Sequence, residues 1–315
     1  MPLSLRPVMV FVLVCATGWA VPAVAQLDLK FNLRPGHRVT QTMEINQTIA
    51  QQMMGMDINM QQLIGMTTTG VVGDRASDAG GVWLDVTYDH VRFKQDGGPM
   101  GAVDYDSANP PADVPLAARG FSALIGRTLS IEYDAVGDVV QIEGVDKALD
   151  AMIESMDLPA GPARDGAVAM IKSQFNEDIV KQMVAINLGM YPGRLVDRGD
   201  QWDDQQQIGG MTPMKFDYRY TLEDYDEAQA TLKLDGKISP HLDAPPFNMN
   251  GAEFDAEMKG TQAGTIMVNL ATGWPKSIDM TQDIDGGITV HTPDGGAMDI
   301  EMKIVGTVKV ATDER

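Results

Sequence analysis

The chain has 315 residues, of which 24 are basic and 44 acidic, and its net charge is −20. A surface of that sign repels phosphate backbones and anionic headgroups, so binding to nucleic acid or to a bilayer surface by counterion release is excluded as a function. The length is sufficient to bury one large core or two half-size cores.

The first 25 residues have the pattern of a cleavable signal peptide. Arg6 is the only charged residue among them, and the apolar run 8–16 follows it. The stretch ends on Ala23-Val24-Ala25, a spacing of small residues that a signal peptidase accepts. We therefore predict a signal peptide at 1–25 and an exported product, periplasmic or extracellular, that starts at Gln26.

Two alternatives to this cleavage stay open. A retained membrane anchor is disfavoured because the apolar run is shorter than the roughly 20 residues of a spanning helix, so no stable membrane insertion is expected after cleavage. Lipid attachment at Cys15, the only cysteine, is disfavoured by the large Leu13 and Val14 before it. Cleavage after Ala25 leaves 23 basic and 44 acidic residues, a net charge of −21, and no thiol for a disulfide or a thiolate metal site.

Alternating apolar and polar residues predict strands in the first half of the mature chain. Period two at 27–33 predicts a short strand that ends at the Pro35-Gly36 turn, and the alternation then predicts long antiparallel strands at 38–52, 57–73 and 81–94. The Gly-, Pro- and Asp-rich stretch 97–115 is expected to be an ordered loop or a lid rather than a strand.

A hairpin and a helical segment follow. The hairpin is predicted at 128–133 and 139–143, with glycine in its turn. Between 145 and 189 apolar residues recur at helical spacing, which predicts two amphipathic helices broken near 158–162. The stripes of these helices would face the sheet, and they supply the residues expected to line an apolar ligand pocket: Met152, Met156, Met170, Phe175 and Met183.

Strand-like alternation returns after the helices. The predicted strands are 201–208, 215–222, 228–238, 257–270, 277–283, 287–292 and 298–310. Asp-Gly-Gly steps begin at Asp96, Asp285 and Asp294, and the last two are expected to be hairpin turns.

The order of strands, helices and strands predicts an α+β fold, a curved antiparallel sheet packed against a central pair of helices. Residues 26–315 are expected to form a single β-rich envelope domain. Loose echoes between the two strand blocks leave open a second organisation, in which half-domains 26–144 and 195–315 are joined by the helical segment 145–190.

No local motif predicts catalysis, a metal site or a cofactor. The four histidines, His37, His90, His241 and His291, are too far apart in sequence for metal-ligand spacing, and the phosphate-loop, dinucleotide and nucleophile-elbow patterns are absent. Acidic pairs are frequent, which makes chance proximity expected. An incidental calcium shared by Asp283, Asp285 and Asp294, and an enzyme with a dispersed acidic site, stay open as alternatives.

Methionine is the least ordinary feature, with 22 in the chain. Six crowd one predicted hairpin: Met43, Met53, Met54, Met56, Met60 and Met66. Thioethers can bind Cu(I), can adapt to irregular or lipid-like ligands, or can simply pack a hairpin. The neighbouring glutamines, Gln41, Gln47, Gln51, Gln52, Gln61 and Gln62, add neither charge nor soft ligands, and so they favour packing or a solvated face.

Several short motifs together resemble a known family. They are Phe31-Asn32-Leu33-Arg34-Pro35-Gly36, the Gln- and Met-rich hairpin, Tyr105-Asp106-Ser107, Leu124-Ile125-Gly126, Ile131-Glu132-Tyr133, Gly137-Asp138-Val139 and Gly144-Val145-Asp146. In this order they resemble a family of exported bacterial proteins that carry a domain of unknown function. The motifs are turn and packing residues, so the resemblance implies no active site.

The expected architecture also resembles the half-barrels of periplasmic lipoprotein carriers, which implies an apolar concavity. The sequence therefore predicts a non-enzymatic envelope protein that binds a hydrophobic or lipid-like ligand or a partner protein. The alternative is a purely structural or interaction module of the cell surface that has no small-molecule ligand. A filled or a hollow sheet would separate these two functions.

Overall fold

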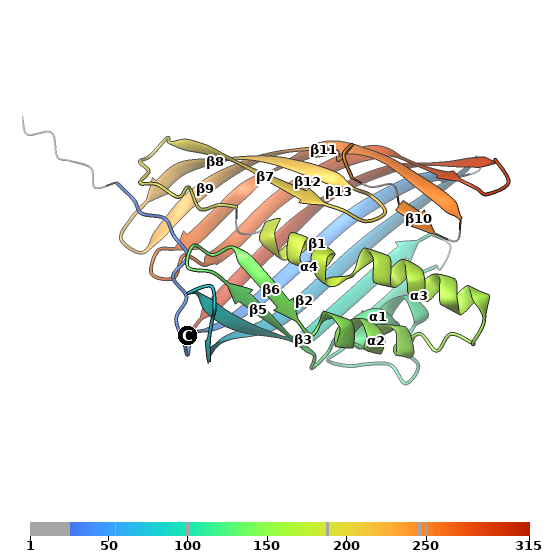
Figure 1. The fold of residues 1–315 in the computed structure, drawn as a ribbon, viewed down its shortest axis with the longest axis horizontal. Coiled ribbons are helices and arrows are strands. Elements are labelled where there is room, and N and C mark those ends of the chain that lie inside the picture. Colours follow the sequence, from blue (N-terminus) through green and yellow to red (C-terminus); the bar gives the residue numbers. More distant parts are fainter. Residues whose placement is uncertain (1–25, 54, 99–100, 187–188, 245–246, 250) are drawn as a thin grey trace, which may run out of the picture.

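The computed structural model describes residues 26–53, 55–98, 101–186, 189–244, 247–249 and 251–315. The predicted signal peptide and Met54 lie outside the described residues. Within them the chain forms one 13-stranded sheet with helices on its inner side (Figure 1).

The N-terminal strands follow the predicted alternation closely. The three long ones are β1 (Arg38–Met53), β2 (Met56–Ala76) and β3 (Val82–Gly97), and they are followed by β4 (Val103–Asp106), β5 (Thr128–Tyr133) and β6 (Val139–Glu143). The predicted β1, β2 and β3 and the β5–β6 hairpin are confirmed, because one face of each strand carries apolar side chains that the fold buries.

The C-terminal strands make the other half of the sheet. They are β7 (Gln201–Ile208), β8 (Met214–Tyr225), β9 (Gln229–Pro240), β10 (Phe247–Met249), β11 (Ala252–Asn269), β12 (Pro275–His291) and β13 (Ala297–Glu314). All named strand pairs are antiparallel.

The first and the last strand meet in the middle of the sheet. The strand order is β6-β5-β3-β2-β1-β13-β12-β11-β9-β8-β7, so β1 pairs with β13 along nearly its whole length. The N-terminal strands form one wing of a curved trough and the C-terminal strands form the other, which leaves β6 and β7 as the two edges (Figure 1). The predicted curved antiparallel sheet is confirmed.

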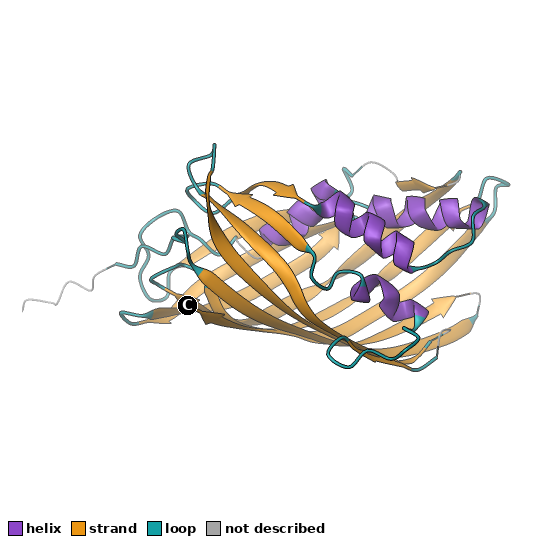
Figure 2. Ribbon diagram, turned by 90° about the horizontal axis from the view of Figure 1, so that it is seen from below, coloured by secondary structure: helices purple, strands orange, loops and turns teal. Residues whose placement is uncertain are grey.

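The helices lie on the inner side of this trough (Figure 2). They are α1 (Leu116–Ser122), α2 (Val145–Ser155), α3 (Pro162–Gln174) and α4 (Glu177–Ala185). A pair of helices was predicted between 145 and 189, and the break near 158–162 is confirmed. A second break separates α3 from α4, because the Asn176 side chain accepts a hydrogen bond from the Ile179 N–H (3.0 Å) and caps a new helix.

Helix α4 closes the space between the two sheet edges. The Lys181 ammonium donates to the Val140 carbonyl oxygen on β6 (2.7 Å), and the next side chain, Gln182, accepts from the Gly209 N–H just after β7 (2.9 Å). Unpaired edge strands are a liability in an open sheet, and α4 covers both. The cross-section at this level is therefore a ring of sheet and helix.

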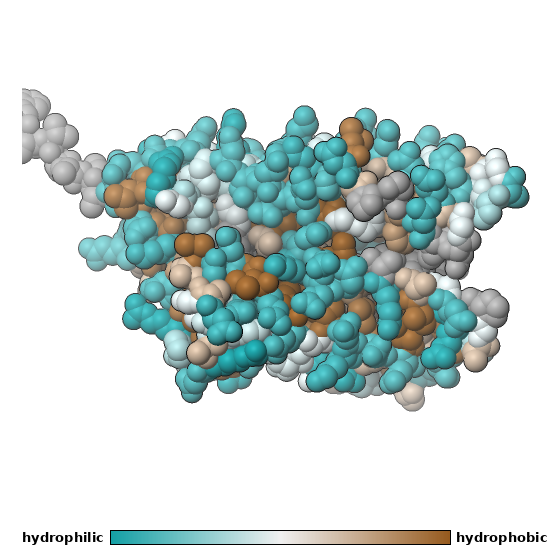
Figure 3. All heavy atoms as spheres, viewed as in Figure 1, coloured by the Kyte–Doolittle hydropathy of each residue, from teal (hydrophilic) through white to brown (hydrophobic). Residues whose placement is uncertain are grey.

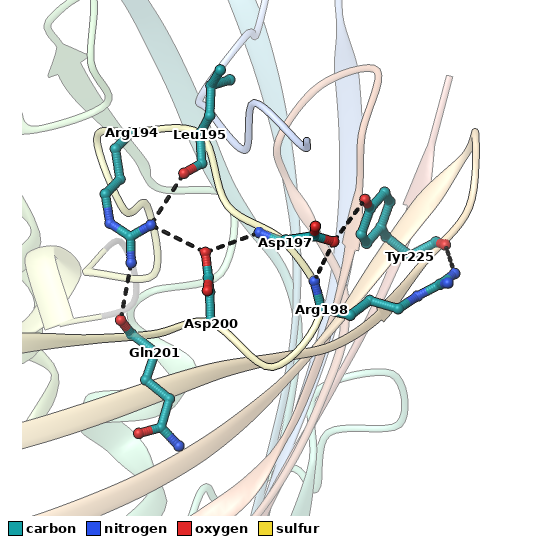
Figure 4. A network of polar contacts seen from close by, with 7 residues as sticks. All are labelled: Arg194, Leu195, Asp197, Arg198, Asp200, Gln201 and Tyr225. Carbon is teal, nitrogen blue, oxygen red and sulfur yellow. Dashed lines mark hydrogen bonds and ion pairs between the residues drawn. The ribbon is translucent and has the colours of Figure 1, made fainter. Parts of the chain in front are cut away.

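The loop from α4 into β7 is fixed by charged side chains (Figure 4). Arg194 donates to the Asp200 carboxylate (3.2 Å) and to the Gln201 carbonyl oxygen (3.1 Å), and Asp200 also accepts from the Asp197 N–H (3.0 Å). The backbone hydrogen bond, aided by Arg194, lowers the pKa of Asp200. These contacts hold the start of edge strand β7 in place.

One end of the trough is filled. A buried cluster on β8, β9 and β11 includes Leu222, Leu232 and Val268, and another joins β3, β5 and β6 to α2 through residues such as Leu149. Four rings from separate segments meet at the second cluster, with centroids 5.1–6.5 Å apart: Phe31, Tyr133, Tyr191 and Trp274. Tyr191 also packs against the first cluster. This end has a conventional packed core.

The expected loop at 97–115 is wrong in part. It contains β4, which pairs with β3 and buries Val103 and Tyr105. The alternation of four residues was too short to stand out among glycine, proline and aspartate. Helix α1 follows it and was not predicted, and the predicted strand 27–33 is reduced to an isolated bridge between Leu27 and Val196.

The expected hairpin turn at Asp285 is also wrong. Asp285, Gly286 and Gly287 lie inside β12, which merges the strands predicted at 277–283 and 287–292. A Cβ at Gly286 would collide with the Glu257 carbonyl oxygen on β11, so glycine here permits close strand approach instead of a turn. The turn predicted at Asp294 is confirmed, between β12 and β13.

Candidate functional site

The inner face of the central strands is the main candidate for a binding site. Side chains alternate across a strand, so every second residue of β1, β2, β12 and β13 points into the trough. Along β1 these inward residues are half-buried whereas their neighbours Glu44, Asn46 and Thr48 are exposed. Among the inward positions of these four strands that have a register partner on a neighbouring strand, the one charged residue is Glu314, at the end of β13 beside His37.

We define the floor as the half-buried apolar residues on the inner face of β2, β1 and β13. It consists of Met43, Ile45, Ile49, Met60, Ile64, Met66, Met302, Ile304 and Val308. Register places Ile45 opposite both Ile64 and Val308, and Ile49 opposite both Met60 and Ile304. The floor runs from Met43 to Ile49 over about 20 Å, at roughly 3.4 Å per residue. Solvent reaches these residues, unlike Leu232 or Val268, which are 0% exposed.

A row of polar side chains crosses the inner face at one level. Direct register partners connect nine strands in the order Gln95, Gln62, Gln47, Gly306, Gln282, Gln262, Gly236, Tyr218 and Asp204. We call this row the amide belt. It separates the floor into an apolar zone at Met43 and Ile45 and another at Ile49 and Ile304.

The glutamines of the belt form two hydrogen-bonded chains. On the β1 side, Gln47 Nε2 donates to Gln62 Oε1 (3.1 Å) and Gln62 Nε2 donates to Gln95 Oε1 (2.9 Å). On the β12 side, the Tyr218 hydroxyl donates to Gln262 Oε1 (2.8 Å), and Gln262 Nε2 donates to Gln282 Oε1 (3.3 Å). Buried amides need partners, and these chains supply them.

The two hydrogen-bonded rows of side chains end on either side of Gly306. The hydrogen bonds described above use the Gln47 amide nitrogen and the Gln282 carbonyl oxygen. Gln47 Oε1, an acceptor, and Gln282 Nε2, a donor, make no further hydrogen bond within the described residues. Gly306 stands between them in register and has no side chain.

Of the residues predicted to line a pocket, the structure brings Met152 and Met156 together. Met152 lies on α2 and Met156 directly follows this helix. Both are near α1, where a Cβ at Gly120 would be 3.3 Å from the Met152 methyl group and 3.8 Å from that of Met156. Phe175 is 40% exposed and Met183 is 47% exposed. The side chain of Met170 lies outside the described residues.

The face that bears the helices is apolar along its middle. In the space-filling view, apolar residues gather over the helices between polar rims (Figure 3). The α4 stripe that faces inward consists of Ile179, Val180 and Val184, and Met183 lies beside it on the exposed side. The expected lid at 97–115 supplies Val103 and Tyr105 to a small separate core with Phe93.

The methionine-rich hairpin contributes to the floor. Met43 pairs with Met66, and Met60 pairs with Ile49, all on the inner face. Met56 is more than half exposed near the hairpin turn, and Met54 lies outside the described residues. The neighbouring Gln47 and Gln62 belong to the amide belt and not to a solvated face.

Other candidate groups have local partners. His90 lies 2.7 Å from Asp106, and this hydrogen bond is the main cause that lowers the pKa of Asp106. The proposed calcium carboxylates are separated: Asp283 faces Lys303 (3.3 Å), Asp285 faces Lys259 (3.8 Å), and Asp294 lies in a turn. Among the described residues no group of three His, Cys, Asp or Glu side chains could hold a metal.

The outer face carries a polar depression of about 840 Å³ over β1, β2, β12 and β13. Its lining includes Asp57, Asp285, Asp299 and Glu301 together with Lys303. Asp57 accepts from Gln52 (3.0 Å) and Asp299 accepts from Thr289 (2.8 Å), so part of this acidic surface is already satisfied. It is a second candidate, with chemistry opposite to that of the floor.

The amide belt was missed in the sequence, although half of it had a readable signal. Gln47 and Gln62 lie equally far from the β1–β2 turn, so simple hairpin counting places them opposite each other. The pairing of Gln47 with Gly306 joins residues from opposite ends of the chain, and a register shift after Met267 obscures the alignment of β11 with β12. No local pattern gives these contacts.

Comparison with protein families gives one match. The DUF6263 family, described as a family of unknown function, matches residues 79–275. A search among curated proteins finds no match. In the described part of the chain, no helix has both the length and the apolarity needed to cross a membrane.

Solved structures show weak similarity at low identity. One match is lipovitellin, from a structure of its lipid–protein interactions, with 11% sequence identity and a TM-score of 0.45. The match covers 90% of this chain and 26% of the lipovitellin chain. The outer membrane protein OprG from Pseudomonas aeruginosa is 5% identical with a TM-score of 0.25, over 90% of this chain and 98% of that chain. This chain thus spans about a quarter of the lipovitellin chain. TM-scores this low support no statement about what this chain binds.

Proposed function

We propose that this chain, which belongs to the DUF6263 family of unknown function, binds an uncharged lipid-like ligand against the floor of its trough. The observation that carries the proposal is the contrast in burial along one face. Inward residues at the filled end, such as Leu222 and Leu232, are 0% exposed, whereas the floor residues of β1, β2 and β13 are half-buried.

Burial of the floor by a ligand is favourable. Each square ångström of apolar surface removed from water contributes roughly 25 cal/mol, so several half-buried isoleucines and methionines together provide a driving force for binding. Methionine side chains are flexible, and Met43, Met60 and Met66 can adapt to an irregular or mobile acyl chain.

The charge distribution favours a neutral ligand. The inward positions of β1, β2, β12 and β13 offer no lysine or arginine to a phosphate or carboxylate headgroup. The lysines of these strands point outward, where Lys303 and Lys309 face Asp283 and Asp279. A buried, unpaired anion would be strongly unfavourable in the trough.

Export and a non-enzymatic role are part of the same proposal. The n-region, apolar run and small-residue motif of 1–25 support secretion, with a mature chain that starts at Gln26. The floor and belt offer thioethers, amides, one phenol and, on β7, the Asp204 carboxylate, which accepts a hydrogen bond from Gln206 (2.9 Å). This set of groups suits binding rather than turnover. N-terminal sequencing of the protein isolated from its host tests the cleavage, and an intact N-terminus in the cytoplasm would contradict it.

The binding test uses a matched pair of variants on β1. The mature protein is purified without detergent, its organic extract is analysed by mass spectrometry, and the affinity for an uncharged apolar fluorescent probe is titrated. We expect co-purified neutral lipid, and for Ile49→Gln at least tenfold weaker probe binding, because Ile49 faces the trough.

Thr48→Gln is the control, since Thr48 is exposed on the outer face of the same strand. It should leave probe binding unchanged. A protein that carries no lipid and binds no probe, or an equal effect of both substitutions, would contradict the proposal.

A second candidate function rests on the outer depression. Its carboxylates Asp57, Asp299 and Glu301 could meet basic side chains of a partner protein, in keeping with the interaction module expected as the alternative. Pull-down from an envelope extract with wild type and with Glu301→Lys tests it. A salt-sensitive partner that the variant loses would support this function, and an identical set of partners would contradict it.

A further inference from the structure

We propose that the amide belt recognises a hydroxyl group of the ligand at Gly306, where the hydroxyl donates to Gln47 Oε1 and accepts from Gln282 Nε2. This proposal rests on the proposed function and narrows its ligand class to a neutral lipid that carries a hydroxyl group. The site has three parts: the unpaired amide atoms of Gln47 and Gln282 at the ends of the two hydrogen-bonded rows, the glycine between them, and the apolar zones on both sides.

Strand spacing explains why one more atom fits at Gly306. Where two glutamines occupy adjacent strands, their amides bond directly, at 3.1 Å for Gln47–Gln62 and 3.3 Å for Gln262–Gln282. Gln47 and Gln282 lie two strands apart, at a strand separation of roughly 9–10 Å. A single oxygen that both donates and accepts can complete the row.

The protein itself shows this arrangement at the second glycine of the belt. Gly236 lies between Gln262 and Tyr218, and Tyr218 lies over it, where a Cβ at Gly236 would be 2.8 Å from the ring. The Tyr218 hydroxyl then reaches Gln262 Oε1 at 2.8 Å. A hydroxyl therefore spans one glycine position of the row, and the Gly306 position offers the equivalent acceptor with an added donor.

Gly306 is also required by the approach of β1. A Cβ there would lie 2.6 Å from the Asn46 carbonyl oxygen and 2.8 Å from the Gln47 Cβ. Substitution of Gly306 would therefore shift the strands as well as the site. Gln47 and Gln282 are the better residues for a test.

The amide atoms that Gln47 and Gln282 present to Gly306 determine which functional group of a ligand can bind there. Gln47 presents an acceptor and Gln282 a donor, so a hydroxyl satisfies both, whereas an alkane satisfies neither and a carboxylate would place its charge opposite the Gln47 oxygen. Apolar residues flank this point on both sides, Ile45 and Val308 on one and Ile49 and Ile304 on the other. The hydroxyl is thus expected at the level of the belt, with the hydrocarbon along the floor.

The experiment compares three probes on the mature protein: a medium-chain primary alcohol, the alkane with the same number of carbons, and the corresponding fatty acid. Affinities are measured by displacement of an apolar fluorescent probe. The alcohol should bind about tenfold more tightly than the alkane, as expected for about one net hydrogen bond.

Substitutions show which residues cause the preference for the alcohol over the alkane. Gln47→Leu and Gln282→Leu should each remove the preference for the alcohol and keep alkane binding, whereas Gln61→Leu, on the exposed outer face of β2, should change neither. Side-chain amide resonances of wild-type protein give a readout that does not depend on the stability of a variant. Alcohol should shift the signals of Gln47 and Gln282, and alkane should not.

The outcomes separate this proposal from the proposed function. If none of the three probes binds, the lipid-binding function itself is wrong, and this proposal falls with it. If alcohol and alkane bind equally and the two amide signals do not respond, only the hydroxyl site is wrong, and the belt interacts with water alone. Tighter binding of the fatty acid than of the alcohol would also overturn it.

Discussion

The two faces of the four central strands have opposite chemistry. On the outer face of β12 and β13, lysines and aspartates pair across the strands, as in Lys303–Asp283 (3.3 Å) and Lys309–Asp279 (3.7 Å). On the inner face, the same strands carry methionine, isoleucine and valine, crossed by amides. The outer polar groups meet water, and the inner polar groups meet one another. The inner face is therefore where removal of a single polar or apolar group has the larger effect.

The largest expected effect is a loss of folding stability in alkaline solution. Burial raises the pKa of Tyr133, Tyr191, Tyr218 and Tyr220, which lie within the trough. In the unfolded chain tyrosine ionises at about pH 10, so above that pH the folded protein retains protons that the unfolded protein releases. Stability should be unaffected below that pH and should fall as the pH rises above it, until the fold is lost.

Circular dichroism and tyrosinate absorbance, recorded together along an alkaline titration, check this expectation. The buried tyrosines should ionise only as the fold is lost, and Tyr220→Phe should make the loss of stability with pH shallower. Ionisation of all seven tyrosines near their ordinary pKa in a protein that remains folded would contradict it.

The second prediction compares the stability lost when a side chain is truncated at the filled end of the trough with the stability lost on the floor. Leu232→Ala should lower the free energy of unfolding by about 2–5 kcal/mol, since it leaves a cavity in a packed core. Ile304→Ala on the half-buried floor should cost about 1 kcal/mol or less without ligand. Urea unfolding measures both. Equal losses would mean that the floor is packed like the core.

A smaller effect is expected from the belt. Tyr218→Phe removes the buried hydroxyl that donates to Gln262 and leaves that amide oxygen without this donor. The loss of stability should be about 1–3 kcal/mol. The matched substitution Tyr225→Phe changes a tyrosine at the end of β8, whose hydroxyl donates to Asp197 over a longer distance (3.4 Å), and should cost less. A larger loss for Tyr225→Phe in urea unfolding would argue against the belt as a stabilising element.

The smallest effect belongs to the outer face. Lys303→Ala breaks an exposed ion pair with Asp283, and such pairs contribute about 0–1 kcal/mol that salt screens further. Unfolding at low and high salt should show a small difference that disappears at high salt. A loss as large as that of Leu232→Ala would mean that the outer face has a structural role that the contrast between the two faces does not predict.

Local alternation was sufficient to predict most strands and the break between α2 and α3, because a strand with one buried face repeats every two residues whatever its partner. It failed where the signal was short or ambiguous. Val103–Asp106 was hidden by its neighbours, and Gly286 and Gly287 indicated a turn although they permit close packing of β12 on β11. The residues predicted to line a pocket follow from helical stripes and stay a prediction, and the half-buried apolar residues of the floor lie on the strands.

The sequence by itself determined the strand periodicity, the acidic surface and the expectation of export. Each follows from composition or from contacts between close neighbours in the chain. Only the tertiary structure decided that β1 pairs with β13, that α4 covers both sheet edges, and that glutamines from distant strands form one row. The physical reason is that strand register between remote segments depends on the curvature of the whole sheet and on bulges such as that after Met267, and no local pattern specifies these.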